Sequence, residues 1–256
     1  MGQKGVILEA FTSMAPRYEQ VVDKELKRFW GWSYTDFIDH MLTITPFQDG
    51  DTILDVATGT AVIPLKLTRL GKKWCQLVGL DITFAMLKKA QRKIMADDSR
   101  ENHPLTPAPI RLSCASAMAL PYRNDSFSVI LCALAAHHLD VPVVLAEMGR
   151  TLKPGGRLTI ADVIGSPVWH LPVINTLIRI ATFIYFLPQE GFARARAESS
   201  ALSNVYTGNE WERWLIKAGF TEIVITSLPT SHSWLPSPLV IQAKKIIPEG
   251  YRVDCN

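Results

Sequence analysis

The fold of this chain is decided by the stretch TILDVATGTA, residues Thr52–Ala61. Its apolar first half is typical of a buried strand, which carries Asp55 near its end and runs into a turn of small residues around Gly59. A helical pattern of apolar residues follows from Val62 to Leu70. A strand, a tight glycine turn and a helix present a nucleoside ligand at the carboxyl end of an α/β sheet, so this stretch predicts a nucleoside-binding α/β fold.

The second strand, Gln76–Asp81, also ends in an acidic residue, twenty-six positions after Asp55. An acid at the tip of the second strand is placed to bind ribose hydroxyls. A dinucleotide fingerprint would need a glycine three positions after Gly59, where this chain has Val62. A cofactor without phosphate, such as S-adenosylmethionine (SAM), makes weaker demands on this turn. The alternative is an ordinary strand-to-helix turn of an unrelated α/β protein.

Further motifs follow in order and at suitable distances, and with them the chain resembles the class I SAM-dependent methyltransferases. Within that group it is similar to the ubiquinone/menaquinone-biosynthesis C-methyltransferase family and its natural-product relatives. The resemblance extends from about Phe11 to Lys245. The matching segments are FTSMAPRY (11–18), DVATGT (55–60), LDI (80–82), ML (86–87), ALPY (119–122), HHL (137–139) and KPGG (153–156).

Strand and helix patterns alternate along the chain, which predicts an α/β, Rossmann-like sheet that is mostly parallel and has helices on both faces. The last two strands are joined by a short proline-rich segment, so we expect a hairpin and an antiparallel last strand. The predicted strands are 52–57, 76–81, 110–114, 126–133, 156–163, 222–227 and 239–244. The predicted helices are 18–41 with a break near Gly31, one after Gly59, 83–95, 141–152 and 209–218, with an exposed loop at 97–109.

The length of 256 residues suits a single methyltransferase domain, residues 1–256. Residues 1–50 are expected to form an N-terminal helical cap and residues 165–208 a helical lid insertion. The net charge is only +3 and there is no polybasic run, so a nucleic-acid partner is not predicted. The pattern assigns no oligomeric state.

The cysteines and the N-terminal residues predict a cytoplasmic protein. Cys75, Cys114 and Cys132 fall inside apolar strand-like runs, where reduced, buried cysteine is expected. Cys255 is far from them, and the chain has no CxxC pair. The first ten residues are too poor in apolar side chains for a signal peptide.

The run Val168–Leu187 is unusually apolar for a segment outside the predicted sheet. Pro172 and Arg179 argue against a membrane span, which needs about twenty apolar residues with few interruptions. One interpretation is a further core helix. The resemblance implies instead a lid over an apolar substrate, and such a lid could also rest on a bilayer as a peripheral membrane contact.

The resemblance implies a role for each residue around the first two strands. Asp81 would accept both ribose hydroxyls, with a helix N-cap as its structural alternative. Asp55 would contact the methionine amino group. The turn residues Ala57, Thr58 and Gly59 would bring backbone close to the methionyl portion.

Further cofactor contacts are implied from the later motifs. Ile82 and Met86 would line the adenine and ribose, although Met86 at helical spacing is equally a core residue. Ser116 stands where the family usually has an aspartate for the adenine amino group, and a hydroxyl binds there without charge assistance. Ala117 would offer backbone to the adenine, and Leu134 would lie beside the sulfonium.

Two adjacent histidines, His137 and His138, follow the fourth strand on the ligand side of the sheet. Either has a pKa suited to removing a proton from the methyl acceptor. Their structural alternative is one ring in the core and one capping a helix. Asp162, at the end of the fifth strand, is also near the site by topology. The chain has no metal-ligand spacing such as HExxH, so a metal is not predicted.

The substrate is expected to contact the cap and the lid. Arg194 and Arg196, with Arg179, could hold the diphosphate of a prenyl substrate. The alternative, which the pattern favours, is a solvated helix face on which Glu198 pairs with them. The predicted substrate-binding residues are Tyr18, His170, Ile174, Phe183, Glu190 and Arg194.

The sequence thus predicts a SAM-dependent methyltransferase that moves a methyl group to a carbon or oxygen of a hydrophobic small molecule. A quinol, a phenol, a polyketide or a terpenoid would suit. Ser116, together with Ala61 in place of the usual glycine, keeps two alternatives open. One is a methyltransferase-like protein that binds SAM structurally and catalyses another reaction, such as a cyclisation. The other is a prenyl-diphosphate C-methyltransferase.

Overall fold

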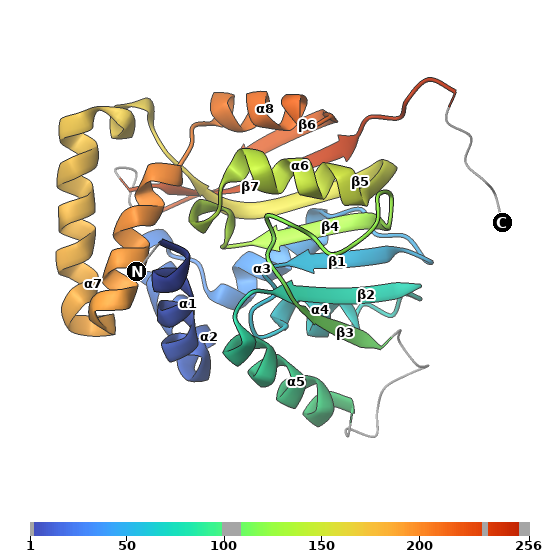
Figure 1. Cartoon of the computed structure of the whole chain (residues 1–256), viewed down its shortest axis with the longest axis horizontal. Coiled ribbons are helices and arrows are strands. Elements are labelled where there is room, and N and C mark those ends of the chain that lie inside the picture. The colour runs from blue at the N-terminus through green and yellow to red at the C-terminus, as the bar shows by residue number, and fades with distance from the viewer. Residues whose placement is uncertain (1–2, 99–108, 232–234, 251–256) are drawn as a thin grey trace.

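The computed structural model describes residues 3–98, 109–231 and 235–250. Within these residues, seven strands form one sheet in the order β3-β2-β1-β4-β5-β7-β6 (Figure 1). The strands are β1 Thr52–Val56, β2 Gln76–Asp81, β3 Ile110–Cys114, β4 Phe127–Ala133, β5 Leu152–Ile164, β6 Phe220–Ser227 and β7 Ser237–Lys245.

Strand directions confirm the predicted mostly parallel sheet. Strands β1 to β5 pair in parallel, whereas β7 runs antiparallel to both β5 and β6. Parallel neighbours need a crossover connection, and here helices supply it after β1, β2 and β4. None of the described residues between β6 and β7 is helical, and these two strands pair as the predicted hairpin.

Helices cover both faces of the sheet. Alternate residues of β1 divide between two cores: Leu54 packs under α6 and α8, while Ile53 packs under α2, α3 and α4. The helices are α1 Gln3–Met14, α2 Tyr18–Trp30, α3 Tyr34–Ile44, α4 Val62–Leu67, α5 Phe84–Asp98, α6 Val141–Thr151, α7 Pro172–Ala201 and α8 Gly208–Lys217.

The helical segment predicted over residues 18–41 is two helices, divided at the expected break near Gly31. Gly31 has φ 81° and closes α2 by donating its N–H to the carbonyls of Leu26 and Lys27. Ser33 then caps α3 by accepting the N–H of Asp36. A left-handed glycine followed by a serine cap ends one helix and starts the next, which the apolar periodicity alone does not reveal.

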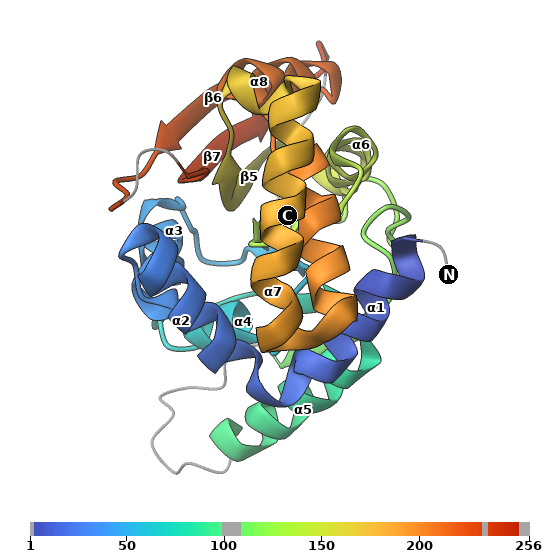
Figure 2. The same cartoon turned by 90° about the vertical axis from the view of Figure 1, so that its left-hand side faces the viewer.

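The chain between β5 and α8 is dominated by α7, which is broken at Gly191 (φ 82°, ψ 177°). The first half of α7 is the outermost helix of the molecule, and the second half returns toward α1 (Figures 1 and 2). The short helices η3 Pro167–His170 and η4 Leu202–Asn204 flank it. Among the described residues, no helix combines the length and apolar character that crossing a bilayer requires.

Two smaller expectations were wrong. Cys75 and Cys114 are exposed, and only Cys132 of the three described cysteines is buried, because the other two lie at strand ends rather than in strand centres. The predicted loop at 97–109 begins too early: α5 continues to Asp98, and Asp97 forms an ion pair with Arg69 at 2.7 Å. Residues 99–108 and Cys255 lie outside the described part of the chain.

Candidate active site

The carboxyl ends of β1, β2, β4 and β5 meet at one edge of the sheet, below α1 and α7. Two cavities lie at this edge. The first, of about 500 Å³, follows the ends of the strands, and the second, of about 690 Å³, lies between α2, α7 and the loop after β4. His138 lines both, so the cavities meet at this side chain.

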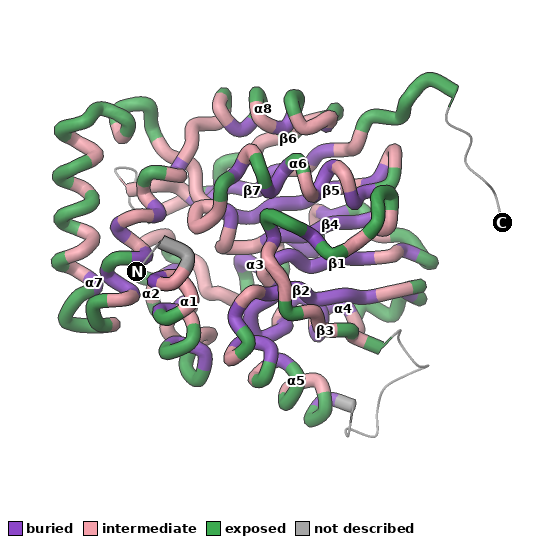
Figure 3. Tube along the Cα trace, viewed as in Figure 1, coloured by how far each residue is buried: buried purple, intermediate pink, exposed green. Residues whose placement is uncertain are grey.

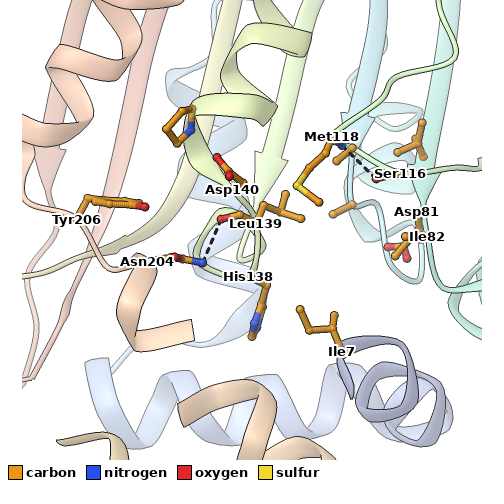
Figure 4. Close-up of a pocket in the computed structure, with 14 residues that line it drawn as sticks. Ile7, Asp81, Ile82, Ser116, Met118, His138, Leu139, Asp140, Asn204 and Tyr206 are labelled. Atoms are coloured by element: carbon orange, nitrogen blue, oxygen red, sulfur yellow. Dashed lines mark hydrogen bonds between the residues drawn. The ribbon is translucent and has the colours of Figure 1, made fainter. Parts of the chain in front are cut away.

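Asp81, at the end of β2, is one of the two acidic residues that line the first cavity, with Asp140 on another side (Figure 4). Its Oδ2 accepts the N–H of Gly59 at 2.9 Å, and its Oδ1 accepts the N–H of Thr83 at 2.7 Å. Burial raises the pKa of this carboxyl, while those backbone donors act against the rise. The Ile82 backbone and the Thr83 side chain also hydrogen-bond to this carboxyl, so its position at the end of β2 is fixed.

The turn after β1 is wound in the left-handed region at Ala57 (φ 58°), Gly59 (φ 54°) and Ala61 (φ 60°). Two of these three carry a Cβ, so the turn stores backbone strain. Thr58 secures it, because its hydroxyl donates to Asp55 Oδ2 at 2.6 Å and its N–H donates to the carbonyl of Leu80 at 2.9 Å. The strained turn is therefore fastened to both neighbouring strands.

Gly79 permits this arrangement, and the motif analysis did not single it out. A Cβ on Gly79 would lie 2.8 Å from Thr58 Oγ1 and 2.9 Å from its Cγ2. Only glycine allows β2 to pass this close beneath the turn. An isolated glycine inside a strand pattern is the signal that could have identified it.

Asp55 lies behind the turn and is almost fully buried. Burial raises its pKa to about 7, the Thr58 hydroxyl acts against that rise, and the charge of Asp81 adds to it. A carboxyl of this kind gains from a nearby cation, because a positive charge would favour its ionised form.

A short polar contact joins His137, which lines the second cavity, to Asp162 of β5. His137 Nδ1 lies 2.5 Å from Asp162 Oδ1, and the His137 backbone N–H donates to Asp162 Oδ2. Burial alone would lower the pKa of His137, but the Asp162 carboxylate outweighs it and raises the pKa above the ordinary value. If Nδ1 carries the hydrogen donated to Asp162, Nε2 is free to accept a proton.

His138 has the opposite tendency. Burial and the neighbouring His137 lower its pKa, although Glu198 acts against them. Its Nε2 lies 3.4 Å from Glu198 Oε1, and its buried Nδ1 has no hydrogen-bond partner among the described residues. The two adjacent histidines therefore differ in charge preference because they face different neighbours.

Arg194 lines the second cavity and is buried between two carboxylates. Its guanidinium lies 3.2 Å from Glu25 and 3.0 Å from Glu198, and it stacks over the rings of Phe11 and Phe186. The solvated helix face predicted for Arg194 is wrong, although its expected pairing with Glu198 is present. Only the fold of α7 onto α2 brings Glu25, 169 residues away in sequence, into this cluster.

Glu198 also completes a trio with His137 and His138, whose ligand-type atoms lie within 4.8 Å of one another. These residue types can hold a transition metal. Here, however, the Arg194 guanidinium already neutralises Glu198, and Asp162 already engages His137. The absence of a metal from the reaction stays a prediction.

Comparison with known proteins finds a methyltransferase domain in this chain and similar methyltransferases. A methyltransferase domain matches residues 54–160. A demethylmenaquinone methyltransferase of Symbiobacterium thermophilum is 27% identical over 205 residues, covering 78% of this chain and 74% of that protein. A ubiquinone/menaquinone biosynthesis C-methyltransferase of Marinomonas sp. is 28% identical, covering 61% of this chain and 58% of that protein, less than two thirds of its length. The chain carries a SAM-dependent methyltransferase domain.

Solved structures agree with this methyltransferase fold. The geranyl diphosphate C-methyltransferase of Streptomyces coelicolor superposes with a TM-score of 0.60 at 14% identity, covering 83% of this chain and 77% of that one. At this identity the likeness concerns the fold alone. SAM is the cofactor of this methyltransferase, and the first cavity has the size and strand-end position of a nucleoside site.

In this methyltransferase, most of the residues predicted to bind the cofactor lie in the lining of the first cavity or are hydrogen-bonded to it. Asp55, Thr58 and Gly59 stand directly behind the first cavity, linked to it by the hydrogen bonds of the turn and Asp81. Met86 is buried in the core, and Leu134 lines the second cavity instead of the first. The predicted residues that line the first cavity are Ala57, Asp81, Ile82, Ser116 and Ala117.

The predicted substrate residues divide into two groups. Tyr18, Ile174 and Arg194 line the second cavity with His137 and His138. The other three do not line it and have partners elsewhere. His170 lies 3.2 Å from Glu210, Phe183 packs on Phe192, and Glu190 pairs with Arg17 at 2.8 Å.

Several lining residues of this methyltransferase escaped the sequence analysis. Ile7, Asn204 and Tyr206 close the far side of the first cavity, where Asn204 donates to the carbonyl of Leu139 at 3.1 Å (Figure 4). Glu25 lines the second cavity. The sequence gives little indication of these residues, because each lies in the helical cap or in the segment after α7, far from the motifs.

Proposed function

We propose that this methyltransferase moves a methyl group from SAM to a carbon or oxygen of an apolar ring compound that carries a hydroxyl group, such as a quinol or phenol. The observation that carries the proposal is the His137–Asp162 pair: His137 lines the second cavity next to His138, the residue at which the two cavities meet, and Asp162 holds it from β5. A hydroxyl-bearing acceptor must lose a proton during methylation, and this pair is built to accept one.

We assign the first cavity to the cofactor. Asp81 would accept the ribose hydroxyls, Ile82 and Ala117 would flank the adenine, and Ser116 would accept its amino group. Asp55 would face the amino group of the methionyl portion, whose positive charge suits a buried carboxyl. SAM, once bound, supplies an electrophilic methyl group on a sulfonium.

In this mechanism His137 is the proton acceptor and Asp162 is its positioning residue. Asp162 holds the ring through Nδ1 and stabilises the imidazolium that forms when Nε2 takes the proton. His138 has a lowered pKa and remains neutral. The pair performs the same task for an oxygen acceptor and for a ring carbon made nucleophilic by its hydroxyl.

The second cavity fits an apolar acceptor with one polar end. Aromatic and aliphatic side chains of α2 and α7 form most of it, and the polar groups gather at the end near His138. Two buried atoms there, His138 Nδ1 and Arg194 Nε, lack a hydrogen-bond partner among the described residues. A hydroxyl can accept from the guanidinium and donate to the imidazole, which would satisfy both atoms.

We infer that residues 1–50 and 165–208 act as cap and lid of a single domain, residues 1–256. The helices α2 and α7 of these segments enclose the second cavity and would exclude water from the transferring methyl group. A polyketide or terpenoid with a hydroxylated ring would also suit this cavity. The names of the menaquinone and ubiquinone relatives support a quinol.

A prenyl diphosphate suits the cavity less well. The described lining offers a single arginine, Arg194, which is already neutralised by Glu25 and Glu198. Arg196 and Arg179 are exposed and do not line the cavity. A doubly charged headgroup would therefore meet carboxylates instead of free cations.

The proposal is tested by titration and turnover. The purified protein is titrated with SAM, with Asp81→Asn as the variant, and is then incubated with SAM and a panel of quinols and phenols. We expect SAM binding that Asp81→Asn weakens at least tenfold, and a methylated product whose formation His137→Gln abolishes and His40→Gln, outside both cavities, leaves intact. SAM binding with no methylated product would favour the non-methylating alternative, and no SAM binding would refute the proposal.

An apolar acceptor of this kind partitions into lipid. We therefore propose a peripheral membrane contact for this protein. The described structure of a single chain leaves its oligomeric state to experiment.

A further inference from the structure

The outer face of α7 carries an apolar stripe that no part of the described chain covers. Its residues are spaced by four, three, four and three positions, which puts them on one side of a helix. Each is between 41% and 71% exposed. Figure 3 shows this half of α7 as largely exposed, in contrast to the buried strands. The residues of the stripe are Val173, Leu177, Ile180, Ile184 and Leu187.

The charges around the stripe are positive. Between Pro172 and Gln189 the only charged side chain is Arg179, which is exposed and flanks the stripe. Arg28 of α2 lies 5.2 Å from the ring of Tyr185 on the same helix. The first acid, Glu190, is paired with Arg17. A cationic margin around an apolar surface matches anionic lipid headgroups.

A second apolar face of α7 lies roughly 120° around the helix from the stripe, at 100° per residue. Its residues Ile174, Ile178, Ala181 and Tyr185 line the second cavity. The first half of α7 is therefore apolar on the side of the cavity and apolar on the side of the solvent. A helix of that kind needs a non-aqueous neighbour on its outer face.

We propose that this stripe is the surface by which the protein docks on an anionic bilayer, with α7 lying in the headgroup region. The position of the helix allows it, because the first half of α7 is the outermost element of the molecule (Figures 1 and 2). Arg179 would extend its guanidinium to phosphate while its stem lies on the lipid. Docking would also bring the second cavity next to the membrane, and this part rests on the proposed function.

The test is co-sedimentation of the SAM-free protein with vesicles of phosphatidylcholine, with and without phosphatidylglycerol. The variant Leu177→Gln/Ile184→Gln removes two apolar side chains that line neither cavity. Its matched control is Ile216→Gln on α8, exposed to a similar degree. Circular dichroism checks that all variants are folded.

We expect the wild type and the control to bind the anionic vesicles, and the double variant to bind about tenfold more weakly or worse. Arg179→Gln should reduce the preference for phosphatidylglycerol and its sensitivity to salt. No binding by the wild type, or equal binding by the double variant, would overturn the proposal. So would a concentration-dependent dimer in sedimentation velocity that the double variant loses, because the stripe would then bind a second copy.

A methyl-transfer assay distinguishes a failure of membrane docking from a failure of the proposed function. If both hold, the double variant methylates a detergent-dispersed acceptor at the wild-type rate but is slower with the same acceptor in vesicles. If the wild type binds vesicles but methylates no quinol or phenol, docking stands and the assigned acceptor fails. Vesicle binding itself needs neither SAM nor acceptor.

Discussion

The pKa values of two residues of the site, His137 and Asp55, are set by burial and by the charged groups next to them. Asp162 is itself kept ionised, because the His137 imidazole outweighs the burial that would raise its pKa. No cation among the described residues acts on Asp55, and burial raises its pKa to about 7. Both effects follow from charges that have little water to screen them. Each gives a prediction for a single substitution.

Asp162→Asn should change the pH dependence of methyl transfer. With Asp162 present, activity should rise with pH as His137 loses its proton, at a pKa above the ordinary value of about 6.5. Removing the carboxylate should move this midpoint to lower pH and reduce kcat by about 100-fold or more, because the imidazolium loses its partner. A pH profile of kcat/KM is the measurement. A lower rate with an unmoved midpoint would show that Asp162 is only structural.

Asp55→Asn should alter stability in a pH-dependent way. The folded-state pKa of Asp55 lies above the unfolded value, so the folded chain binds a proton that the unfolded chain has lost between about pH 4 and 7. The wild type therefore loses stability as pH rises through this window, and the asparagine does not titrate. Urea unfolding at about pH 5 and about pH 8 should show the variant gaining about 3 kcal/mol relative to wild type between the two pH values, because about two units of the pKa difference lie above pH 5. A difference independent of pH would contradict the raised pKa.

At the scale of elements, the cofactor turn depends on the strand beneath it. The left-handed residues of the turn, the Thr58 hydroxyl and the bare Gly79 of β2 form one packed unit. Its geometry then places the Gly59 N–H on Asp81. A change in β2 should therefore reach the cofactor site without touching a cofactor residue.

Gly79→Ala should weaken SAM binding and lower stability by about 1–3 kcal/mol, since the new Cβ forces Thr58 out of place. Gly208→Ala is the matched control, because its Cβ would make only an ordinary contact, at 3.6 Å. Thermal unfolding and a SAM titration measure both effects. If Gly79→Ala bound SAM as tightly as Gly208→Ala, the packed unit would not control the turn.

At the scale of the whole molecule, one buried ion-pair cluster ties the cap to the lid. Arg194 of α7 joins Glu25 of α2 and Glu198 one turn further along α7. Burial raises the pKa of Glu25 to about 7, although Arg194 acts against that rise. The Glu198 carboxyl has its pKa held well below the usual range, because Arg194 and His138 outweigh its burial. In this cluster Arg194 is therefore the arginine that balances the negative charge of both carboxylates.

Arg194→Met should destabilise the protein by about 3–5 kcal/mol, because it removes the guanidinium between Glu25 and Glu198 and leaves Glu198 with only His138 beside it. Adding Glu25→Gln and Glu198→Gln should recover much of this loss, since the charges that need compensation are gone. Chemical denaturation of the single and triple variants is the measurement. A triple variant no more stable than the single one would mean that the aromatic packing of Arg194, not its charge, holds the segments together.

The strand-and-turn motifs alone determined the sheet, its antiparallel last strand and the cofactor family. These features depend on local periodicity, on small residues at a turn and on an acid at a strand tip, all of which are contiguous in sequence. Asp81 and the cofactor turn were predicted for the same reason. The break near Gly31 was predicted, because a glycine interrupts the helical pattern there, whereas the break of α7 at Gly191 was missed, because a left-handed backbone does not interrupt the apolar pattern.

Only the tertiary structure decided which polar groups share the acceptor cavity. Arg194 resembled a solvated residue on a charged helix until the fold placed it against Glu25 of the cap. The fold also gives His137 a different role from His138, because His137 is the one that hydrogen-bonds to Asp162. It places Ile174 in the lining of the second cavity and leaves Phe183, on another side of α7, outside that lining. The energies of buried charges and the cover of an apolar face depend on neighbours distant in sequence, which no local pattern contains.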